Sequence, residues 1–290
     1  MILVYTDLMA EIYIGTSGYS YPDWRGVFYP EEMKNADFLS FYSRRFGFTE
    51  LNFTYYRQPE PEQCRNFLHQ TPPEFLFTLK AHQSLTHRRG PGWKDEAAVF
   101  REGIQPLAET RRLGAVILQF PYSFGYTREN RLYLARLLER LEGLPLAVEF
   151  RKKEWQNPAV RAGLKERETA EVITDSPRLP GLPETQMCLT SDWGCLRFHG
   201  RNADNWWDGD NVSRYDYRYS RPELEEWVGP ITELARKTRR LFIAFNNHRK
   251  GQAVENALTL RGLLEEEALE VMGPSVSGPE TGKGIDLLDF

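Results

Sequence analysis

The sequence predicts a single parallel-stranded (β/α)8 barrel of the TIM type, with helices on the outside. Two observations predict this fold class. Eight short apolar segments recur along the chain at a spacing of about 30 residues, which is the size of one strand–helix unit. The segments between them show helical patterns of apolar residues, and regular alternation of strands and helices is typical of a parallel sheet.

The predicted strands are mostly rich in valine, isoleucine, leucine and phenylalanine, and glycine, proline or aspartate bounds them. Parallel strands are buried on both faces and therefore read as nearly continuous apolar runs. The eight predicted strands are Ile12–Thr16, Phe48–Phe53, Phe75–Lys80, Ala115–Phe120, Leu146–Phe150, Glu171–Asp175, Cys195–His199 and Leu241–Asn246.

The predicted helices lie between these strands. Asp95 predicts a helix start through its capping side chain, and Asn157-Pro158 predicts another, because proline is favoured in the first helical turn. The clearest helical segments are Asp95–Leu113, Glu129–Leu141, Pro222–Arg239 and Gln252–Glu267. We therefore expect an N-terminal extension (1–10), one barrel domain (11–268) and a tail rich in glycine and proline (269–290).

An open, doubly wound sheet is the alternative fold. Such a sheet usually has a glycine-rich turn after its first strand that leads directly into a long helix. Here Gly15-Thr16-Ser17-Gly18 leads into a loop rich in proline and aromatic residues. This difference favours the barrel.

The composition limits the class of protein. The 290 residues carry a net charge of −4, so only a local basic patch would attract nucleic acid. No apolar run approaches the ~18 residues of a membrane helix, and Met1–Ala10 lacks the basic start of a signal peptide. Cys64, Cys188 and Cys195 show no C-x-x-C spacing, which argues against a zinc ribbon or a disulfide framework. We therefore expect a cytoplasmic protein with no membrane partner.

Polar residues gather at the carboxyl ends of the predicted strands. Side chains two positions apart on a strand face the same way, so Glu149 and Arg151 share a face, as do Arg197 and His199. In a barrel these ends converge on one mouth, where this fold carries its active sites. The candidate catalytic residues are Glu50, Lys80, Glu149, Asp175 and His199. The candidate substrate-binding residues are Asn52, Arg151, Arg197, Asn246, Asn247, Trp24, Tyr55 and His87.

The charges at these strand ends nearly balance. Three carboxylates stand beside one lysine and two arginines, with His199 as a variable group. Carboxylates and a histidine can ligate a divalent metal, but neighbouring arginines repel a cation and pair with the carboxylates. We therefore predict no cofactor and no metal ligands, with a divalent metal kept as an alternative. An anionic or polyhydroxylated ligand fits better, because guanidinium groups bind phosphate and carboxylate through two hydrogen bonds.

Several loops add to this prediction. Asn246–Gln252 follows the last strand and leads straight into a helix, and free amides at a helix N-terminus bind phosphate. An ordinary solvated loop with a helix cap is the alternative there. His82–Trp93 contributes further basic residues, while Tyr19–Tyr29 and Trp206–Tyr219 contribute aromatic ones. Such a surface suits stacking on bases or sugars, although packing within a lid is the more frequent role of aromatic residues.

Several motifs at these strand ends identify a family resemblance. They are GTSGYSYPDWRGVFYP from Gly15, ELNFTYYRQP from Glu50, LQFPYSF from Leu118, AVEFR from Ala147 and LRFHGR from Leu196. In this order, over about residues 12–265, the chain resembles the YecE-like family of uncharacterised proteins, a domain of unknown function. The resemblance implies a TIM-barrel fold and a pocket at the strand ends, and it implies no reaction. Lys152 stands where many relatives have a histidine, and His248 where many have an acidic residue.

Three functional hypotheses follow. The first is an enzyme that hydrolyses a phosphodiester or glycosidic bond in an anionic substrate, with Glu149 or Glu50 as base and Lys80 or His199 as acid or electrostatic stabiliser. The second is a protein that binds single-stranded nucleic acid without chemistry. The third is a metal-dependent phosphodiesterase of the endonuclease-IV type. The basic residues at the strand ends favour the first hypothesis over the third and leave the second open. The sequence identifies no protein partner.

Overall fold

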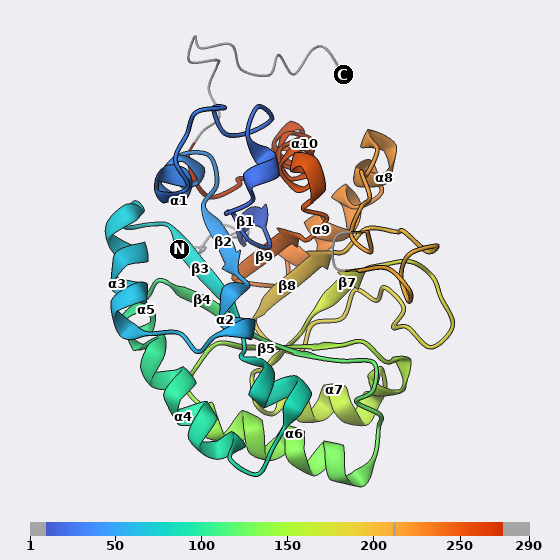
Figure 1. The fold of residues 1–290 in the computed structure, drawn as a ribbon. Helices are drawn as coiled ribbons and strands as arrows, with labels where there is room; N and C mark the ends of the chain where they lie inside the picture. The colour runs from blue at the N-terminus through green and yellow to red at the C-terminus, as the bar shows by residue number, and fades with distance from the viewer. Residues whose placement is uncertain (1–9, 211–212, 275–290) are drawn as a thin grey trace, which may run out of the picture.

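The computed structural model describes residues 10–210 and 213–274 and shows an α/β fold with two parallel sheets and surrounding helices (Figure 1). One sheet has the strand order β1-β9-β8-β7, and the other has the order β2-β3-β4-β5-β6. The strands are β1 (Glu11–Thr16), β2 (Phe48–Leu51), β3 (Leu76–Lys80), β4 (Leu113–Phe120), β5 (Leu146–Phe150), β6 (Ala170–Glu171), β7 (Ile173–Asp175), β8 (Trp193–Phe198) and β9 (Arg240–Phe245).

The two sheets contact each other at two places. Only Val172 separates β6 from β7, and its N–H donates to the carbonyl of Val148 over 2.9 Å. The predicted strand Glu171–Asp175 is thus split between the two sheets. At the other border, Ser17 forms a parallel bridge with Glu50, and the N–H of Gly18 donates to the carbonyl of Glu50 over 2.8 Å.

The buried side chains form two separate apolar clusters. The larger cluster lies between the sheets and the helices and includes Val116 and Leu196. Because side chains alternate across a strand, the smaller cluster marks the opposite face of the strands, which we call the inner face. The smaller cluster contains Tyr13, Phe48, Leu76, Ala115, Ile117, Ala147, Ala170, Val172, Trp193, Cys195, Phe242 and Ala244.

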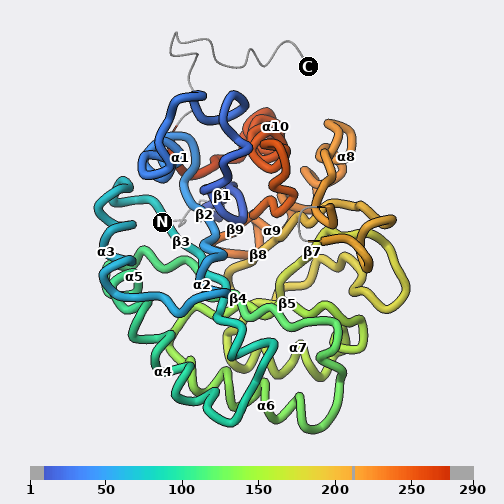
Figure 2. The backbone as a smooth tube through the Cα atoms, viewed as in Figure 1, coloured from blue at the N-terminus to red at the C-terminus, as the bar shows by residue number. Residues whose placement is uncertain are grey.

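The helices pack on the outside of the strands. In Figures 1 and 2, α3 to α7 lie around the β2–β6 sheet, and α8 to α10 lie beside the other sheet. The helices are α1 (Phe38–Tyr42), α2 (Phe53–Tyr56), α3 (Pro61–Gln70), α4 (Trp93–Gly103), α5 (Gln105–Glu109), α6 (Arg128–Arg140), α7 (Pro158–Lys165), α8 (Arg221–Glu225), α9 (Val228–Ala235) and α10 (Gln252–Glu266).

Two predicted helices are each broken by a proline. The segment Asp95–Leu113 forms α4 and α5, and Pro222–Arg239 forms α8 and α9. Pro106 and Pro230 lack the N–H that a continuous helix needs, and the proline ring clashes with the carbonyl four residues earlier. The predictions for α6 and α10 agree with the structure to within one residue. Asn157 caps α7 as predicted, accepting from the N–H of Val160 over 3.1 Å.

The first part of the predicted tail packs against the start of β1. Leu269 and Val271 are buried, and the N–H of Met272 donates to the carbonyl of Ile12 over 2.7 Å. Residues 1–9 and 275–290, which make up most of the predicted extension and tail, lie outside the described residues. Within the described part of the chain, no helix combines the length and the apolar character that crossing a bilayer requires.

Candidate functional site

An ion triad lies on the inner face at the carboxyl ends of three strands. Arg197 on β8 donates to both oxygens of Glu50 on β2, over 2.9 Å from Nε and 2.5 Å from Nη2. Its Nη1 donates to Glu149 on β5. All three side chains are at most 2 % exposed. Each triad residue lies two positions after a member of the smaller apolar cluster on the same strand. Side chains two positions apart on a strand point to the same face, so all three triad residues lie on the inner face.

Glu149 and Arg197 hold each other in their charged forms. Burial alone would raise the pKa of Glu149, but the charges of Arg151 and Arg197 outweigh it and hold that pKa well below its ordinary value. Burial alone would lower the pKa of Arg197, but the two carboxylates outweigh it and raise that pKa. The guanidinium of Arg197 therefore stabilises the buried carboxylates that it contacts, and they stabilise it in turn.

His199 and Arg151 extend this triad into what we call the ion cluster (Glu50, Glu149, Arg151, Arg197 and His199). The Nε of Arg151 lies 2.6 Å from Oε1 of Glu149, and Nε2 of His199 lies 3.2 Å from the same oxygen. These short contacts join the three side chains, and Oε1, Nε and Nε2 have no further hydrogen-bond partner among the described residues.

The imidazole of His199 is neutral. Burial and the nearby charge of Arg151 lower the pKa of His199 to about 3, and the opposing effect of Glu149 does not offset them. The side-chain amide of Asn246 donates to Nδ1 of His199 over 3.1 Å. The single ring proton therefore sits on Nε2, the atom that faces Glu149.

Lys80 lies at the end of β3 beside the ion cluster. Its ammonium nitrogen is 4.2 Å from the centre of the Tyr55 ring. Burial and the charges of Arg197 and Arg151 lower the pKa of Lys80 to about 7. An amine with this pKa is present in both protonation states near neutral pH, which suits a group that gives and takes protons.

Buried polar atoms without hydrogen-bond partners gather at these strand ends. Thr78 faces the same way as Glu50, because the two residues are paired in register between β3 and β2. Ser17 faces the same way through its bridge to Glu50. Within the described residues, the atoms here without a partner are Ser17 Oγ, Asn52 Oδ1 and Thr78 Oγ1, while Glu149 Oε1, Arg151 Nε and His199 Nε2 have only their short contacts with one another.

Aromatic rings surround these strand ends. The ring centres of Tyr55 and His87 lie 4.9 Å apart. The guanidinium carbon of Arg151 lies 5.6 Å from the centre of the Trp206 ring. Tyr215 is 5.9 Å from the His199 ring. Burial and the charge of Lys80 lower the pKa of His87 to about 4, so this imidazole is neutral as well. The structure thus places Tyr55 and His87 beside the predicted charged residues.

Asp175 does not join the ion cluster. In the β7–β8 register Thr174 pairs with Arg197, whereas Asp175 pairs with Phe198, whose side chain packs toward the helices. Asp175 therefore points to the outer side, where it accepts from Nε of Arg201 over 2.9 Å. Burial raises the pKa of Asp175, and Arg201 offsets this only in part. The structure thus places Asp175 on the side of the strands opposite the ion cluster, apart from the other predicted catalytic residues.

Trp24 and Asn247 hold loops together and do not line the site. Trp24 is fully buried, and its indole N–H donates to the carbonyl of His248 over 2.6 Å. Asn247 is fully buried too, and its amide donates to the carbonyl of Tyr217 and to Asn256, each over 2.8 Å. The indole N–H of Trp24 and the side-chain N–H groups of Asn247 thus bond within the fold.

We expect Trp24→Phe to lower the free energy of unfolding by about 1–3 kcal/mol, because it removes the only polar link of the indole and leaves a small cavity. Urea denaturation measures this change. Trp207→Phe is the matched control, since Trp207 is 46 % exposed and its substitution should change the stability by no more than about 0.5 kcal/mol. Equal effects of the two substitutions would contradict the structural role of Trp24.

The predicted phosphate loop before α10 is occupied by carboxylates. Arg249 pairs with Asp216, and the N–H of Lys250 donates to Asp23 over 2.8 Å. Gly251 precedes α10 with a φ of 78°, which breaks the simple run from strand to helix. Because these groups already pair within the fold, an ordinary loop fits this segment better than a phosphate site, although no side chain caps α10.

The site residues that the sequence analysis did not include are Thr78, Gln119 and Tyr215. Gln119 pairs in register with Glu149 and lies 3.4 Å from both arginines of the ion cluster. Alternation from Lys80 and Glu149 could have identified Thr78 and Gln119. Tyr215 lies in the long connection after β8, where no periodic pattern predicts direction.

No group of three or more histidine, cysteine, aspartate or glutamate side chains is arranged to hold a metal within residues 10–210 and 213–274. The carboxylates nearest the strand ends, Glu50 and Glu149, instead accept hydrogen bonds from Arg197.

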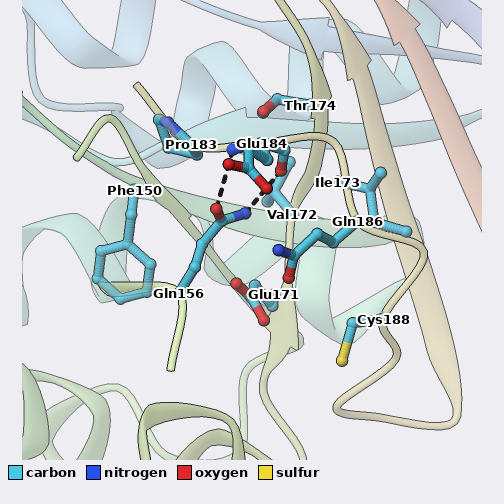
Figure 3. Close-up of a pocket in the computed structure, with 10 residues that line it drawn as sticks. All are labelled: Phe150, Gln156, Glu171, Val172, Ile173, Thr174, Pro183, Glu184, Gln186 and Cys188. Atoms are coloured by element: carbon cyan, nitrogen blue, oxygen red, sulfur yellow. Dashed lines mark hydrogen bonds between the residues drawn. The ribbon is translucent and has the colours of Figure 1, made fainter. Parts of the chain in front are cut away.

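A small pocket lies apart from the ion cluster, between the end of β5, the β6–β7 segment and residues 183–188 (Figure 3). Its polar groups bond to one another. Gln156 donates to the carbonyl of Glu184 over 2.7 Å and accepts from the N–H of Glu184 over 2.9 Å. Glu171 accepts from Arg161 over 2.8 Å. None of the predicted site residues lines this pocket.

The fold and the site define an α/β protein whose parallel strands carry charged residues at their carboxyl ends, a class in which ligands bind at this end of the sheet. The family can be named as well. The model of the family described as "Protein of unknown function DUF72" matches residues 13–281, and the chain belongs to this family. The resemblance to YecE-like proteins is thereby confirmed.

The chain is similar to two curated relatives of that family. It is 29 % identical to the UPF0759 protein YunF of Bacillus subtilis (strain 168) over 272 residues, which cover 88 % of this chain and 95 % of YunF. It is 31 % identical to the UPF0759 protein YecE of Escherichia coli O157:H7 over 177 residues, which cover 57 % of this chain and 59 % of YecE.

Solved structures show the same fold. The crystal structure of a DUF72 family protein from Thermotoga maritima MSB8 is 40 % identical, with a TM-score of 0.82 over 88 % of this chain and 99 % of that chain. A DUF72 family protein from Enterococcus faecalis V583 is 25 % identical, with a TM-score of 0.80 over 93 % of this chain and all of that chain.

Proposed function

We propose that the two sheets are parts of one closed (β/α)8 barrel. The Ser17–Glu50 bridge supports closure at one border, and the single residue between β6 and β7 supports it at the other. The smaller apolar cluster supports it too, because this one cluster takes residues from both sheets. Its members would fill the barrel interior, and the ion cluster would lie at the mouth formed by the carboxyl ends of the strands.

We further propose that this mouth binds a small anionic ligand that carries phosphate or carboxylate and that it performs acid–base chemistry on this ligand. The set of unpartnered polar atoms at the strand ends carries this proposal. A buried polar atom without a partner costs about 1–3 kcal/mol, so such atoms are few in native proteins. Their concentration at one place is the property of a binding site.

Arg151 is the residue that we assign to the anion. Arg197 donates hydrogen bonds from Nε and both Nη atoms to Glu50 and Glu149. We therefore assign it the role of positioning these two carboxylates. Arg151 contacts Glu149 through Nε and Gln119 through Nη2, and its side chain is 11 % exposed, so within the described residues its Nη1 remains as a donor for a ligand. Lys80 adds a second positive charge when it is protonated.

Lys80 and His199 are the residues that we assign to proton transfer. Glu149 is a weak base, because its pKa is held well below the ordinary value. Lys80, with a pKa of about 7, can protonate a leaving oxygen in phosphodiester hydrolysis. Glycosidic hydrolysis needs one of two carboxyl groups protonated, and the contacts of Glu50 and Glu149 with Arg197 oppose that state.

Thermal unfolding in sodium phosphate, compared with sodium chloride of equal ionic strength, tests the proposal. Phosphate at about 100 times its Kd should stabilise the protein by about 2.7 kcal/mol. Arg151→Met should weaken phosphate binding by about ten- to a hundredfold, because a hydrogen bond between charged groups contributes about 1.5–3 kcal/mol.

Lys152→Met is the matched control, since it removes a positive charge from the neighbouring position, where Lys152 pairs with Glu154 over 3.3 Å. It should leave phosphate binding unchanged. If both variants lose binding equally, or if neither does, Arg151 has no specific role and the proposed anion site is wrong. Circular dichroism verifies that both variants are folded.

A further inference from the structure

Lys80 differs from the other charged groups at the strand ends in having no counter-ion. The nearest carboxylates, Glu50 and Glu149, are bonded to Arg197 and Arg151. Within the described residues, no carboxylate forms an ion pair with Lys80, and its ammonium nitrogen lies over the face of the Tyr55 ring. The two carboxylates that could stabilise a protonated Lys80 are thus paired with Arg151 and Arg197.

We propose that Lys80 is a nucleophile that forms an imine with a small aldehyde or ketone carrying a carboxylate or phosphate group. This inference rests on the proposed anion site, because Arg151 would bind the anionic group and present the carbonyl to the amine. Lysines of this kind are activated by desolvation and by neighbouring cations. Lys80 is half-buried under the Tyr55 ring, at the strand ends that also carry Arg151 and Arg197.

The chemistry needs no redox partner. The nitrogen of neutral Lys80 attacks the carbonyl carbon, a C–N bond forms, and the π electrons of the carbonyl move to oxygen. A proton then passes from the nitrogen to that oxygen, which gives a carbinolamine. The hydroxyl takes a further proton from solvent and leaves as water, while the nitrogen lone pair forms the C=N bond of the iminium ion.

Groups from several elements act on the Lys80 amine. The cations favour the neutral, nucleophilic amine, and the carboxylates oppose them without cancelling their effect and that of burial. The ring of Tyr55 covers the amine from α2, and His87 beside it is neutral. The charged groups that face the amine are Arg197 on β8, Arg151 and Glu149 at the end of β5, and Glu50 on β2.

Reductive trapping of the full-length protein tests this inference. The protein is incubated with pyruvate, with glycolaldehyde phosphate or with acetone, and sodium borohydride then reduces any iminium ion to a stable amine by adding hydride to carbon. Mass spectrometry of peptides identifies the modified lysine. The chain has nine lysines, so exposed residues such as Lys94 and Lys237 are internal controls.

We expect at least tenfold more adduct at Lys80 than at any other lysine, with pyruvate or with glycolaldehyde phosphate, and little with acetone. The two anionic probes distinguish a carboxylate ligand from a phosphate ligand. Adduct formation should rise with pH through about 7, as the amine loses its proton. Lys80→Met should abolish the adduct and Lys152→Met should retain it.

Equal labelling of all lysines, or no adduct at Lys80 with either anionic probe, would overturn the imine. The wild-type peptide map gives this answer even if Lys80→Met does not fold. The proposed function fails in a different way, namely when Arg151→Met leaves phosphate binding unchanged. Phosphate binding that depends on Arg151, together with no adduct, would therefore remove the imine and keep the anion site.

Discussion

Arg197→Met is expected to lower the free energy of unfolding by about 3–5 kcal/mol, which is the usual cost of removing one partner from a buried ion pair. Arg197 donates to Glu50 and Glu149, and both carboxylates are fully buried. Without the guanidinium, Glu50 loses its ion-pair partner and Glu149 keeps only Arg151. Urea denaturation at pH 7 measures the loss as a lower midpoint with an unchanged slope.

Arg240→Met is the matched control. Arg240 pairs with Glu11 over 2.6 Å at the other end of the strands, but the two side chains are 37 % and 45 % exposed. An exposed ion pair contributes at most about 1 kcal/mol, so this variant should lose little stability. A loss at Arg197 as small as that at Arg240 would mean that water reaches the triad and that the carboxylates do not depend on the guanidinium.

A second variant separates lost charge from lost packing. Adding Glu50→Gln and Glu149→Gln to Arg197→Met removes the uncompensated charges while keeping the shape of both side chains. Part of the lost stability should return in this triple variant, because neutral amides cost less to bury than unpaired carboxylates. If the triple variant is no more stable than Arg197→Met, the cost comes from packing and not from charge.

The sequence predicted the strands and most of the ion cluster for a simple physical reason. Strand alternation depends only on residue spacing, and Glu149, Arg197 and His199 follow apolar strands whose parity is unambiguous. The alternation also brings Glu50 to the same face. A shift of one or two residues in where a strand ends does not change the face to which these side chains point, because the alternation is set along the whole strand.

The sequence did not predict where that alternation stops. Asp175 ends a strand that is interrupted at Val172, and only its register with β8 shows that it faces the helices. Gly200, with a φ of 83°, ends the alternation after β8, so Arg201 turns outward to Asp175. A positive φ is accessible to glycine at little cost, and the chain direction beyond it depends on tertiary contacts that spacing does not encode.

The sequence also did not predict which arginine of the ion cluster donates to which glutamate. Arg151 and Arg197 look equivalent as strand-end arginines, yet Arg197 is bonded on all sides and Arg151 is not. This difference arises because Glu50 and Glu149, nearly 100 residues apart, both meet Arg197 across the sheets. Only the structure therefore separates the positioning arginine from the one that can bind a ligand.

The stability of the protein should fall as the pH is lowered below 6.5, and His199 should supply a large share of that fall. The pKa of this buried imidazole is lowered to about 3, whereas a histidine in an unfolded chain has a pKa of about 6.5. Between these values the unfolded state binds a proton that the folded state does not. The free energy of unfolding then changes by about 1.4 kcal/mol per pH unit.

Comparing His199→Gln with the wild type isolates this contribution. Gln keeps a neutral polar side chain beside Glu149 and Asn246 but does not titrate. Urea denaturation between pH 4.5 and 7.5 should give a plot of stability against pH that is flatter for the variant by about 1 kcal/mol per pH unit below pH 6. The range stays above pH 4.5 because Glu149, whose folded pKa is lowered, begins to lose its own contribution only in more acidic solution.

His69→Gln supplies the control for this slope. His69 is exposed on α3, and its substitution should leave the slope unchanged. His87, with a pKa lowered to about 4, contributes in the same direction and remains present in both proteins. Parallel plots for His199→Gln and the wild type would therefore mean that His199 takes up a proton in the folded state. Its Nε2 would then be a cationic donor to Glu149, and the neutral tautomer that we assign to proton transfer would be wrong.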